Sequence, residues 1–266
     1  MRINHIFLER MKAILATQGV SIKRMPNKNL ILNMPENKSK GQLIEFVGPS
    51  GVGKTTLFEN TRKRIQDDWF FEYHARLNIN PGCVDVISKD ILTSLLFSKI
   101  CAIEKYSLEI TEKLSLVERI SQIIQVQLVI NSNNFPKGFV LDEGIYHFFS
   151  EQILEIKDDF TSPLMKNRGF VFLMPQNIRA FKERGLNRKQ ERAPRSKTGR
   201  FFNSVELDVS GAEAQIEIYR NLRALCASHG CPILDISPED DLALNSLKVI
   251  RFLEHIAFNR FHNLQP

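Results

Sequence analysis

From position 42 onward, short apolar runs alternate with longer segments of helical periodicity along this 266-residue chain. Runs of three to six apolar or β-prone residues predict strands, at 43–47, 69–74, 139–141, 170–173 and 232–236. Apolar residues three and four apart predict helices, at 53–66, 88–131, 144–156, 176–184, 207–228 and 238–258, the second as two helices that meet near Tyr106. This alternation predicts an α/β fold, a five-stranded parallel sheet with helices on both faces and a helical insertion.

The residues before position 42 differ from this pattern. Ile3, Phe7, Met11 and Ile14 are spaced for a short amphipathic helix, and 22–41 is polar and reads as an exposed connection. The helix is expected to pack on the body of the protein, with contact to a membrane surface or a partner as the alternative. We therefore divide the chain into an N-terminal addition at 1–41, a main domain at 42–258 and a tail at 259–266.

Composition and charge narrow the class of protein. The chain is 43% hydrophobic and 25% charged, which is ordinary for a globular protein. Its formal net charge of +6 is concentrated at 1–41 and 179–200, so the rest is net negative, unlike a uniformly basic nucleic-acid binder. Four cysteines make no disulfide framework, and no apolar run reaches the length of about 18 residues that would predict a membrane span. A cytoplasmic protein is expected.

A phosphate-binding motif follows the first predicted strand. The segment Gly48-Pro49-Ser50-Gly51-Val52-Gly53-Lys54-Thr55 matches the pattern G-x-x-x-x-G-K-[ST]. Its glycines let backbone N–H groups turn toward phosphate oxygens, and the helix that follows presents its positive N-terminus. Lys54 is suited to the β- and γ-phosphates and the Thr55 hydroxyl to Mg²⁺. We expect these residues, together with Thr56, to bind ATP.

Two acidic residues come directly after the strand at 139–141. A phosphate loop needs a carboxylate on a neighbouring strand to order Mg²⁺, and Asp142 is the best candidate. An N-cap aspartate is the alternative, and it is compatible with the first role. Glu143 is open to two interpretations: it positions water in an ATPase, or it faces the acceptor or acts as its base in a kinase.

A basic segment over about 184–204 is the third candidate feature. Arg184, Arg188 and Arg192 are four residues apart, so they share a face wherever the backbone is helical. Guanidinium groups match the oxygens of a phosphoryl group in transfer, which favours a mobile lid that closes over the phosphates and expels water. A solvated basic loop is the alternative.

Taken together, these features resemble the P-loop nucleoside and nucleoside-monophosphate kinase superfamily, on its thymidylate kinase and deoxynucleoside kinase side. The resemblance covers about 42–258 and is carried by Gly48 to Thr55, by Asp142-Glu143-Gly144, by 171–173 before the basic segment, and by the strand at 232–236 with its helix. It implies ATP and Mg²⁺ as cofactors, Ser237-Pro238-Glu239 near the adenine, and Glu72, His74 and Arg76 facing the acceptor.

Glu72 is then a candidate general base, with a strand-surface glutamate as the alternative. Two departures from the family pattern are present, the first in the lid and the second at the acceptor site. Gln190 stands where the third lid arginine would be, and Asp142-Glu143-Gly144 lacks the Asp-Arg pair common in these kinases.

The sequence thus predicts an ATP- and Mg²⁺-dependent kinase with Lys54, Asp142, Glu143, Arg184, Arg188 and Arg192 as catalytic residues. The acceptor is a small molecule: a nucleoside, a nucleotide or a sugar. The main alternative is a P-loop ATPase that acts as a switch on a protein or nucleic-acid partner, and a nucleic-acid end kinase is a third hypothesis. A homodimer through 88–131 is an open alternative to internal packing of these helices.

Overall fold

The computed structural model describes residues 42–65, 69–71, 86–106, 108–132, 138–156, 163–183 and 209–262. All of them belong to the unit Lys38–Pro266. Several predictions lie outside the described residues: the helix at 3–15, the connection up to 41, the acceptor residues Glu72, His74 and Arg76, and the basic segment at 184–204.

The centre of the unit is a parallel sheet built from the predicted apolar runs. Its strands are β1 (Leu43–Val47), β2 (Trp69–Phe71), β3 (Gly138–Leu141), β4 (Arg168–Leu173) and β5 (Ile233–Ile236). They are ordered β2-β3-β1-β4-β5, and every neighbouring pair is parallel. β1, β3 and β4 are buried along their whole length, as expected for strands covered on both faces. The α/β class with a parallel sheet is confirmed.

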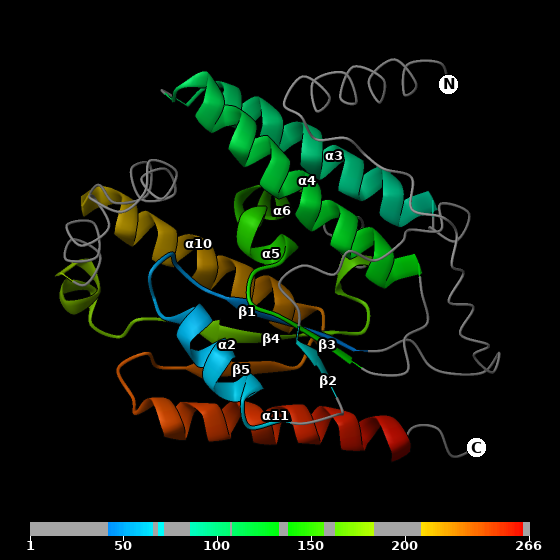
Figure 1. Ribbon diagram of the computed structural model, residues 1–266, viewed down its shortest axis with the longest axis vertical. Coiled ribbons are helices and arrows are strands. Elements are labelled where there is room, and N and C mark those ends of the chain that lie inside the picture. The colour runs from blue at the N-terminus through cyan, green and yellow to red at the C-terminus, as the bar shows by residue number, and fades with distance from the viewer. Residues whose placement is uncertain are drawn as a thin grey trace. The chain divides into compact units, whose positions relative to one another are not determined.

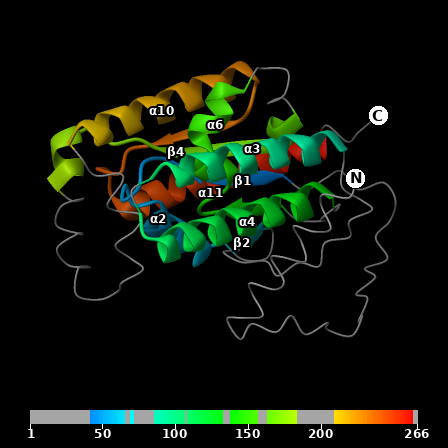
Figure 2. The same ribbon diagram turned by 90° about the horizontal axis from the view of Figure 1, so that it is seen from above.

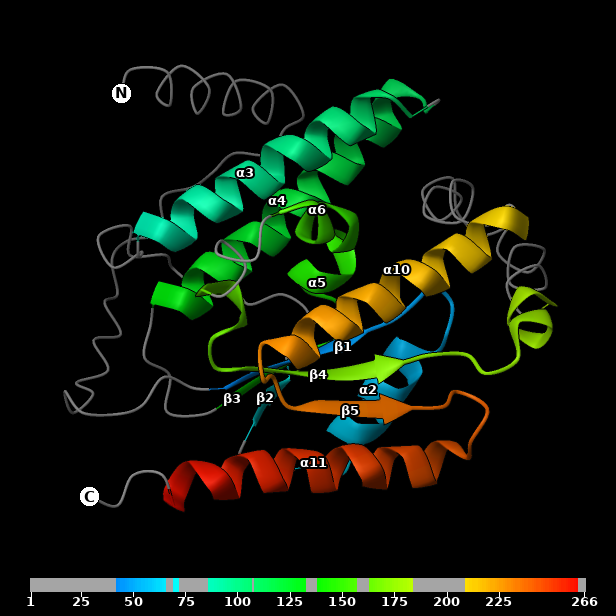
Figure 3. The same cartoon turned by 180° about the vertical axis from the view of Figure 1, so that it is seen from behind.

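Helices cover both faces of the sheet (Figures 1 and 3). One face carries α2 (Lys54–Arg62) and α11 (Leu242–His262), which pack on Ile44 and Phe46 of β1. The other face carries α3 (Val86–Glu104), α4 (Ile110–Ser132), α5 (Ile145–Phe148), α6 (Ser150–Glu155) and most of α10 (Val209–Ser228). The alternation of side chains along a strand therefore sends Glu45 toward the second face.

α3 and α4 form the predicted pair of helices, and they lie side by side (Figure 2). The break between them falls around Tyr106, as the sequence predicts. No helix in the described part of the chain is long and apolar enough to cross a membrane.

Several helix boundaries differ from the prediction. The segment expected as one helix at 144–156 is divided into α5 and α6 at Phe149, whose side chain is completely buried and whose backbone leaves the helical region. The last helix begins at Leu242 instead of position 238, because the Asp241 carboxylate accepts the N–H groups of Ala243 and Leu244 and so caps it. It continues to His262, so part of the predicted tail at 259–266 is helical.

The parallel strands bring their carboxyl ends to one edge of the sheet. In the register of β1, Glu45 is paired with Leu141 of β3 and Val47 with Phe172 of β4. The connections that follow these strands therefore start side by side, which is where ligands bind in open α/β sheets.

Candidate functional site

The phosphate loop connects the end of β1 to α2 and depends on its glycines. Gly48 has a φ of 151°, and a Cβ there would lie 2.3 Å from the carbonyl oxygen of Leu173 at the end of β4. Gly53 is the N-cap of α2 with a φ of 106°. No other residue type fits these two positions without strain, which explains the spacing of the motif.

Lys54 begins α2 and turns back over this loop. Its Nζ donates to the carbonyl oxygens of Gly48 at 2.9 Å and Pro49 at 3.0 Å, and the side chain is only 4% exposed. A buried ammonium is thus held within the loop that the sequence assigns to phosphate.

The next residue links the loop to the neighbouring strand. The Thr55 hydroxyl donates to Oδ2 of Asp142 at 2.7 Å, and Asp142 follows β3 directly. Residues 87 positions apart meet because β1 and β3 are adjacent and end together. A hydroxyl and a carboxylate beside a phosphate loop are oxygen ligands of the kind that Mg²⁺ takes, with phosphates completing its shell.

These residues therefore fit Mg²⁺ bound together with a nucleotide. Among the described residues there is no cluster of three or more His, Cys, Asp or Glu side chains placed to hold a metal ion.

Glu143 is ionised and held by two neighbours. The Arg119 Nη2 of α4 donates to its Oε2 at 2.6 Å, and Nε2 of His147 lies 3.5 Å from its Oε1. Burial raises the pKa of this carboxyl, the positive charges of Lys54 and Arg119 and the hydrogen bond from Arg119 lower it, and the pKa is lowered overall. Lys54 and Glu143 thus belong to one electrostatic site.

His147 is a site residue that the sequence reasoning missed. Burial is the main cause that lowers its pKa to about 3, and the positive charge of Lys54 adds to it. Its Nδ1 lies 2.9 Å from the Tyr219 hydroxyl of α10. A neutral ring has one N–H, and we assign it to Nε2, which turns the N–H toward Glu143 and leaves Nδ1 to accept from the Tyr219 hydroxyl. The sequence did contain one signal for this residue, because it lies four positions after Glu143 and would share its face of a helix.

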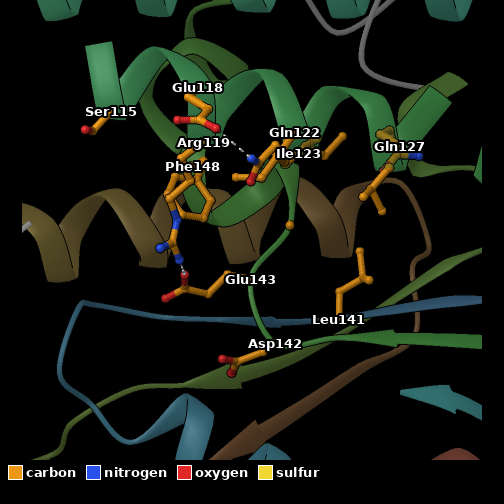
Figure 4. A pocket seen from close by; sticks show the side chains of 13 residues that line it. Ser115, Glu118, Arg119, Gln122, Ile123, Gln127, Leu141, Asp142, Glu143 and Phe148 are labelled. Carbon is orange, nitrogen blue, oxygen red and sulfur yellow. Dashed lines mark hydrogen bonds and ion pairs between the residues drawn. The ribbon is translucent and has the colours of Figure 1, made fainter. Parts of the chain in front are cut away.

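A pocket of about 440 Å³ opens on the same edge of the sheet. One wall is α4 and the other is the segment from β3 into α5. Figure 4 shows Arg119 reaching from α4 past Phe148 to Glu143. Polar and apolar side chains both line the pocket: Ser115, Glu118, Arg119, Gln122, Ile123, Val126, Gln127, Leu141, Asp142, Glu143, Gly144, Ile145 and Phe148. Such a mixture and size suit a small organic molecule with several polar groups.

None of the residues of the α4 wall was identified by sequence reasoning, which named Glu72, His74 and Arg76 for the acceptor. A signal was present, because Ser115, Glu118, Arg119 and Gln122 share one face of a helix by their spacing. Nothing in the sequence alone says which neighbour that face meets.

The connection after β5 is held against the end of β4. Oε2 of Glu239 accepts the Ser237 hydroxyl at 2.9 Å and the backbone N–H of Gln176 at 3.3 Å, and Asn245 Nδ2 donates to the Ser237 carbonyl at 2.7 Å. Burial tends to raise the pKa of Glu239, but the hydrogen bonds lower it overall. This is the segment that the family resemblance places near the adenine.

No family model and no curated protein matches the chain. Among solved structures, a gluconokinase from Sinorhizobium meliloti 1021 is similar at 13% identity and a TM-score of 0.42, over 86% of this chain and 100% of that one. Deoxyadenosine kinase from M. mycoides with bound dCTP is similar at 11% identity and 0.41, over 80% and 99%.

Shikimate kinase from Acinetobacter baumannii, in complex with shikimate, is similar at 12% identity and a TM-score of 0.40, over 81% of this chain and 94% of that one. At such identities and TM-scores, function has to be inferred from the residues of the site itself.

Proposed function

We propose that this chain is an ATP- and Mg²⁺-dependent kinase that transfers the γ-phosphoryl group to a hydroxyl of a small molecule. One observation carries the proposal. Asp142 and Glu143 line a pocket of about 440 Å³, and Asp142 also accepts a hydrogen bond from Thr55 of the phosphate loop. An acceptor-sized pocket and a phosphate site thus share one wall.

The donor phosphates are assigned to the loop 48–56. Lys54 exchanges the carbonyls of Gly48 and Pro49 for phosphate oxygens, and the loop amides supply further donors. Thr55 and Asp142 would hold Mg²⁺, which when bound would neutralise charge on the donor phosphates. In such a reaction catalysis is mainly positioning and electrostatics.

The acceptor occupies the pocket with its hydroxyl toward Glu143. A new bond forms between the hydroxyl oxygen and the γ-phosphorus, the bond from this phosphorus to the β–γ bridging oxygen breaks, and ADP leaves with the electron pair. The hydroxyl proton passes to the Glu143 carboxylate and then to water. A carboxylate with a lowered pKa is a weak base, which suffices where the transition state is loose and orientation matters most.

The lid assignment of Arg184, Arg188 and Arg192 remains part of the proposal. It is supported by the place of β4, which precedes this segment in the chain and ends against the phosphate loop, with the Leu173 carbonyl beside Gly48. Glu72, His74 and Arg76 likewise remain proposed acceptor residues, on the family resemblance alone.

The alternative is a P-loop ATPase in which Glu143 orients water. Its motivation is the position of Glu143 directly after Asp142. The ion pair with Arg119 and the pocket beside it favour the kinase, because both give Glu143 an environment suited to an organic acceptor.

The test is ADP formation by the full chain with Mg·ATP, alone and with a panel of nucleosides, nucleotides, sugars and hydroxy acids. We expect turnover to rise at least tenfold with one class of acceptor, and Glu143→Gln to lose most of that gain while it still binds ATP. Equal turnover with every acceptor and with water alone, together with ATP trapped on Glu143→Gln, would contradict the kinase and establish the ATPase.

A further inference from the structure

Two charged side chains lie in the interior of the sheet, where neither serves the phosphate loop directly. Glu45 in the middle of β1 is 0% exposed and Arg168 at the start of β4 is 3% exposed. Arg168 Nη1 donates to Oε2 of Glu45 at 2.7 Å. A buried ion pair is weak evidence for stability, because apolar residues of similar volume often do as well or better. Stability alone therefore does not explain why this pair is buried here.

Glu45 contacts the turn that carries the acidic site residues. Its Oε1 accepts the backbone N–H of His147 at 3.0 Å, and its carboxylate is also hydrogen-bonded by the N–H groups of Gly144 and Tyr146. A Cβ on Gly144 would lie 2.5 Å from this carboxyl group, so the carboxylate is packed directly against the backbone. One side chain of β1 thus holds three of the four amides that follow Glu143.

Arg168 extends the same network to the pocket wall. Its Nη2 donates to Oε1 of Gln127 at 2.6 Å, its Nε donates to the Leu164 carbonyl at 3.0 Å, and its guanidinium lies over the Tyr146 ring at 4.9 Å. Gln127 belongs to α4 and lines the pocket. α4 also carries Arg119, the partner of Glu143.

We propose that Glu45 and Arg168 are positioning residues for the transfer reaction. They join β1, which continues into the phosphate loop three residues later, to the Asp142–His147 turn and to α4, and so keep donor site, carboxylates and pocket wall in mutual register. This inference rests on the proposed function for its catalytic consequence. A misplacement of about 1 Å at reacting groups can lower a rate on the order of 100-fold.

The test is the double variant Glu45→Leu/Arg168→Met in the full chain. We expect the variant to fold with a melting temperature several degrees below the native value, because the apolar pair fills the same space but leaves the backbone N–H groups bound by Glu45 without an acceptor. The kcat should fall roughly 30- to 100-fold while the Kd for Mg·ATP changes less than about threefold. A pair important only for stability would lower the melting temperature and leave the kcat of the folded variant unchanged.

A second readout does not depend on activity. Hydrogen exchange of the Tyr146 and His147 amides should become at least tenfold faster in the double variant, with the amides of β5 unchanged. The matched control is Arg223→Gln/Asp235→Asn, which removes an exposed two-pronged ion pair between α10 and β5 and should alter neither kcat nor these amides.

Native kcat in the double variant, or unchanged exchange at residues 146 and 147, would overturn the inference. If the double variant does not fold, Glu45→Gln is judged by the same criteria, since it keeps the shape and removes the charge. If the native chain phosphorylates no acceptor, the proposed function fails, while faster exchange at the two amides still shows that the pair holds the turn.

Discussion

At the scale of single residues, each charged side chain of the site is hydrogen-bonded or ion-paired with a neighbour. The Lys54 ammonium donates hydrogen bonds to carbonyl oxygens of the phosphate loop, and the Asp142 carboxylate accepts a hydrogen bond from the Thr55 hydroxyl. The Glu143 carboxylate lies between Arg119 and His147. The contacts of Lys54 and of Asp142 involve only the phosphate-loop motif and the carboxylate that the sequence predicts beside it. The contacts of Glu143 come from elements that the sequence does not place.

His147 makes the stability of the protein sensitive to acid. Its pKa is about 3 in the folded chain, against 6.5 for an ordinary histidine. Below about pH 6.5 the unfolded chain binds a proton that the folded chain does not, so stability is fully present above that pH and is lost as pH falls toward 3. Between pH 7 and pH 5 this histidine should cost about 2 kcal/mol of unfolding free energy.

Urea unfolding of the native chain and of His147→Gln at these two pH values measures this loss. The variant should lose less stability on acidification by about the same 2 kcal/mol. Replacement of the exposed His255 by Gln serves as the control over the same range. Identical pH slopes for the native chain and His147→Gln would show that His147 is not the buried neutral group described here.

At the scale of elements, α4 is the least expected part of the site. The sequence predicts a pair of helices over 88–131, and the structure forms α3 and α4 there. The polar face of α4 that carries Arg119 and Gln122 could be recognised by its spacing. That this face turns toward Asp142 and Glu143 follows from packing, because Ile120 and Ile124 are buried in the core shared with α3 and α5.

The link between α4 and the end of β3 is testable through Arg119→Met. Arg119 and Glu143 are 48% and 24% exposed, so unfolding free energy should change by no more than about 1 kcal/mol. Loss of the positive charge should raise the pKa of Glu143, because Arg119 is one of the groups that lower it. The acid limb of kcat/KM against pH should therefore move to higher pH.

Steady-state rates from about pH 3.5 to 8 measure that limb. Arg223→Met, which removes an exposed helix-to-strand ion pair with Asp235, is the matched control and should leave the limb in place. An acid limb that stays at its native position in Arg119→Met would mean that Glu143 does not set the pH dependence of the reaction.

At the scale of the whole molecule, the parallel sheet decides what meets at its edge. The phosphate loop, the Asp142–Glu143 turn and the end of β4 come from distant parts of the chain and start from neighbouring strands. A ligand bound there contacts several elements at once, so it should stabilise the folded unit as a whole.

Mg·ATP at about 100 times its Kd should stabilise the folded chain by about 2.7 kcal/mol, a rise in melting temperature of roughly 5–10 °C. A thermal melt with and without the nucleotide measures this rise. Lys54→Met should abolish it, and removal of Mg²⁺ with a chelator should reduce it. Lys248→Met, which loses only an exposed pair with Asp240, is the control, and an equal shift in both lysine variants would contradict the assignment of Lys54.

The sequence by itself determined the strands, most of the helices and the residues of the phosphate loop. These features are local, because apolar runs, periodicity and a motif of eight consecutive residues depend only on residues that are close together in the chain. The expectation that Asp142 lies near Thr55 also succeeded, because ends of adjacent parallel strands converge.

Only the tertiary structure decided the partners of Glu143 and the hydrogen-bond network of Glu45 and Arg168. Arg119 and Glu143 are 24 positions apart, and Glu45 and Arg168 are 123 positions apart. Glu45 stands in an apolar strand, where nothing local indicates that its carboxylate holds the backbone of residues 144–147. Such contacts arise when burial of apolar faces sets how helices pack on the sheet, and the charges enclosed by that packing must then find hydrogen-bonding partners.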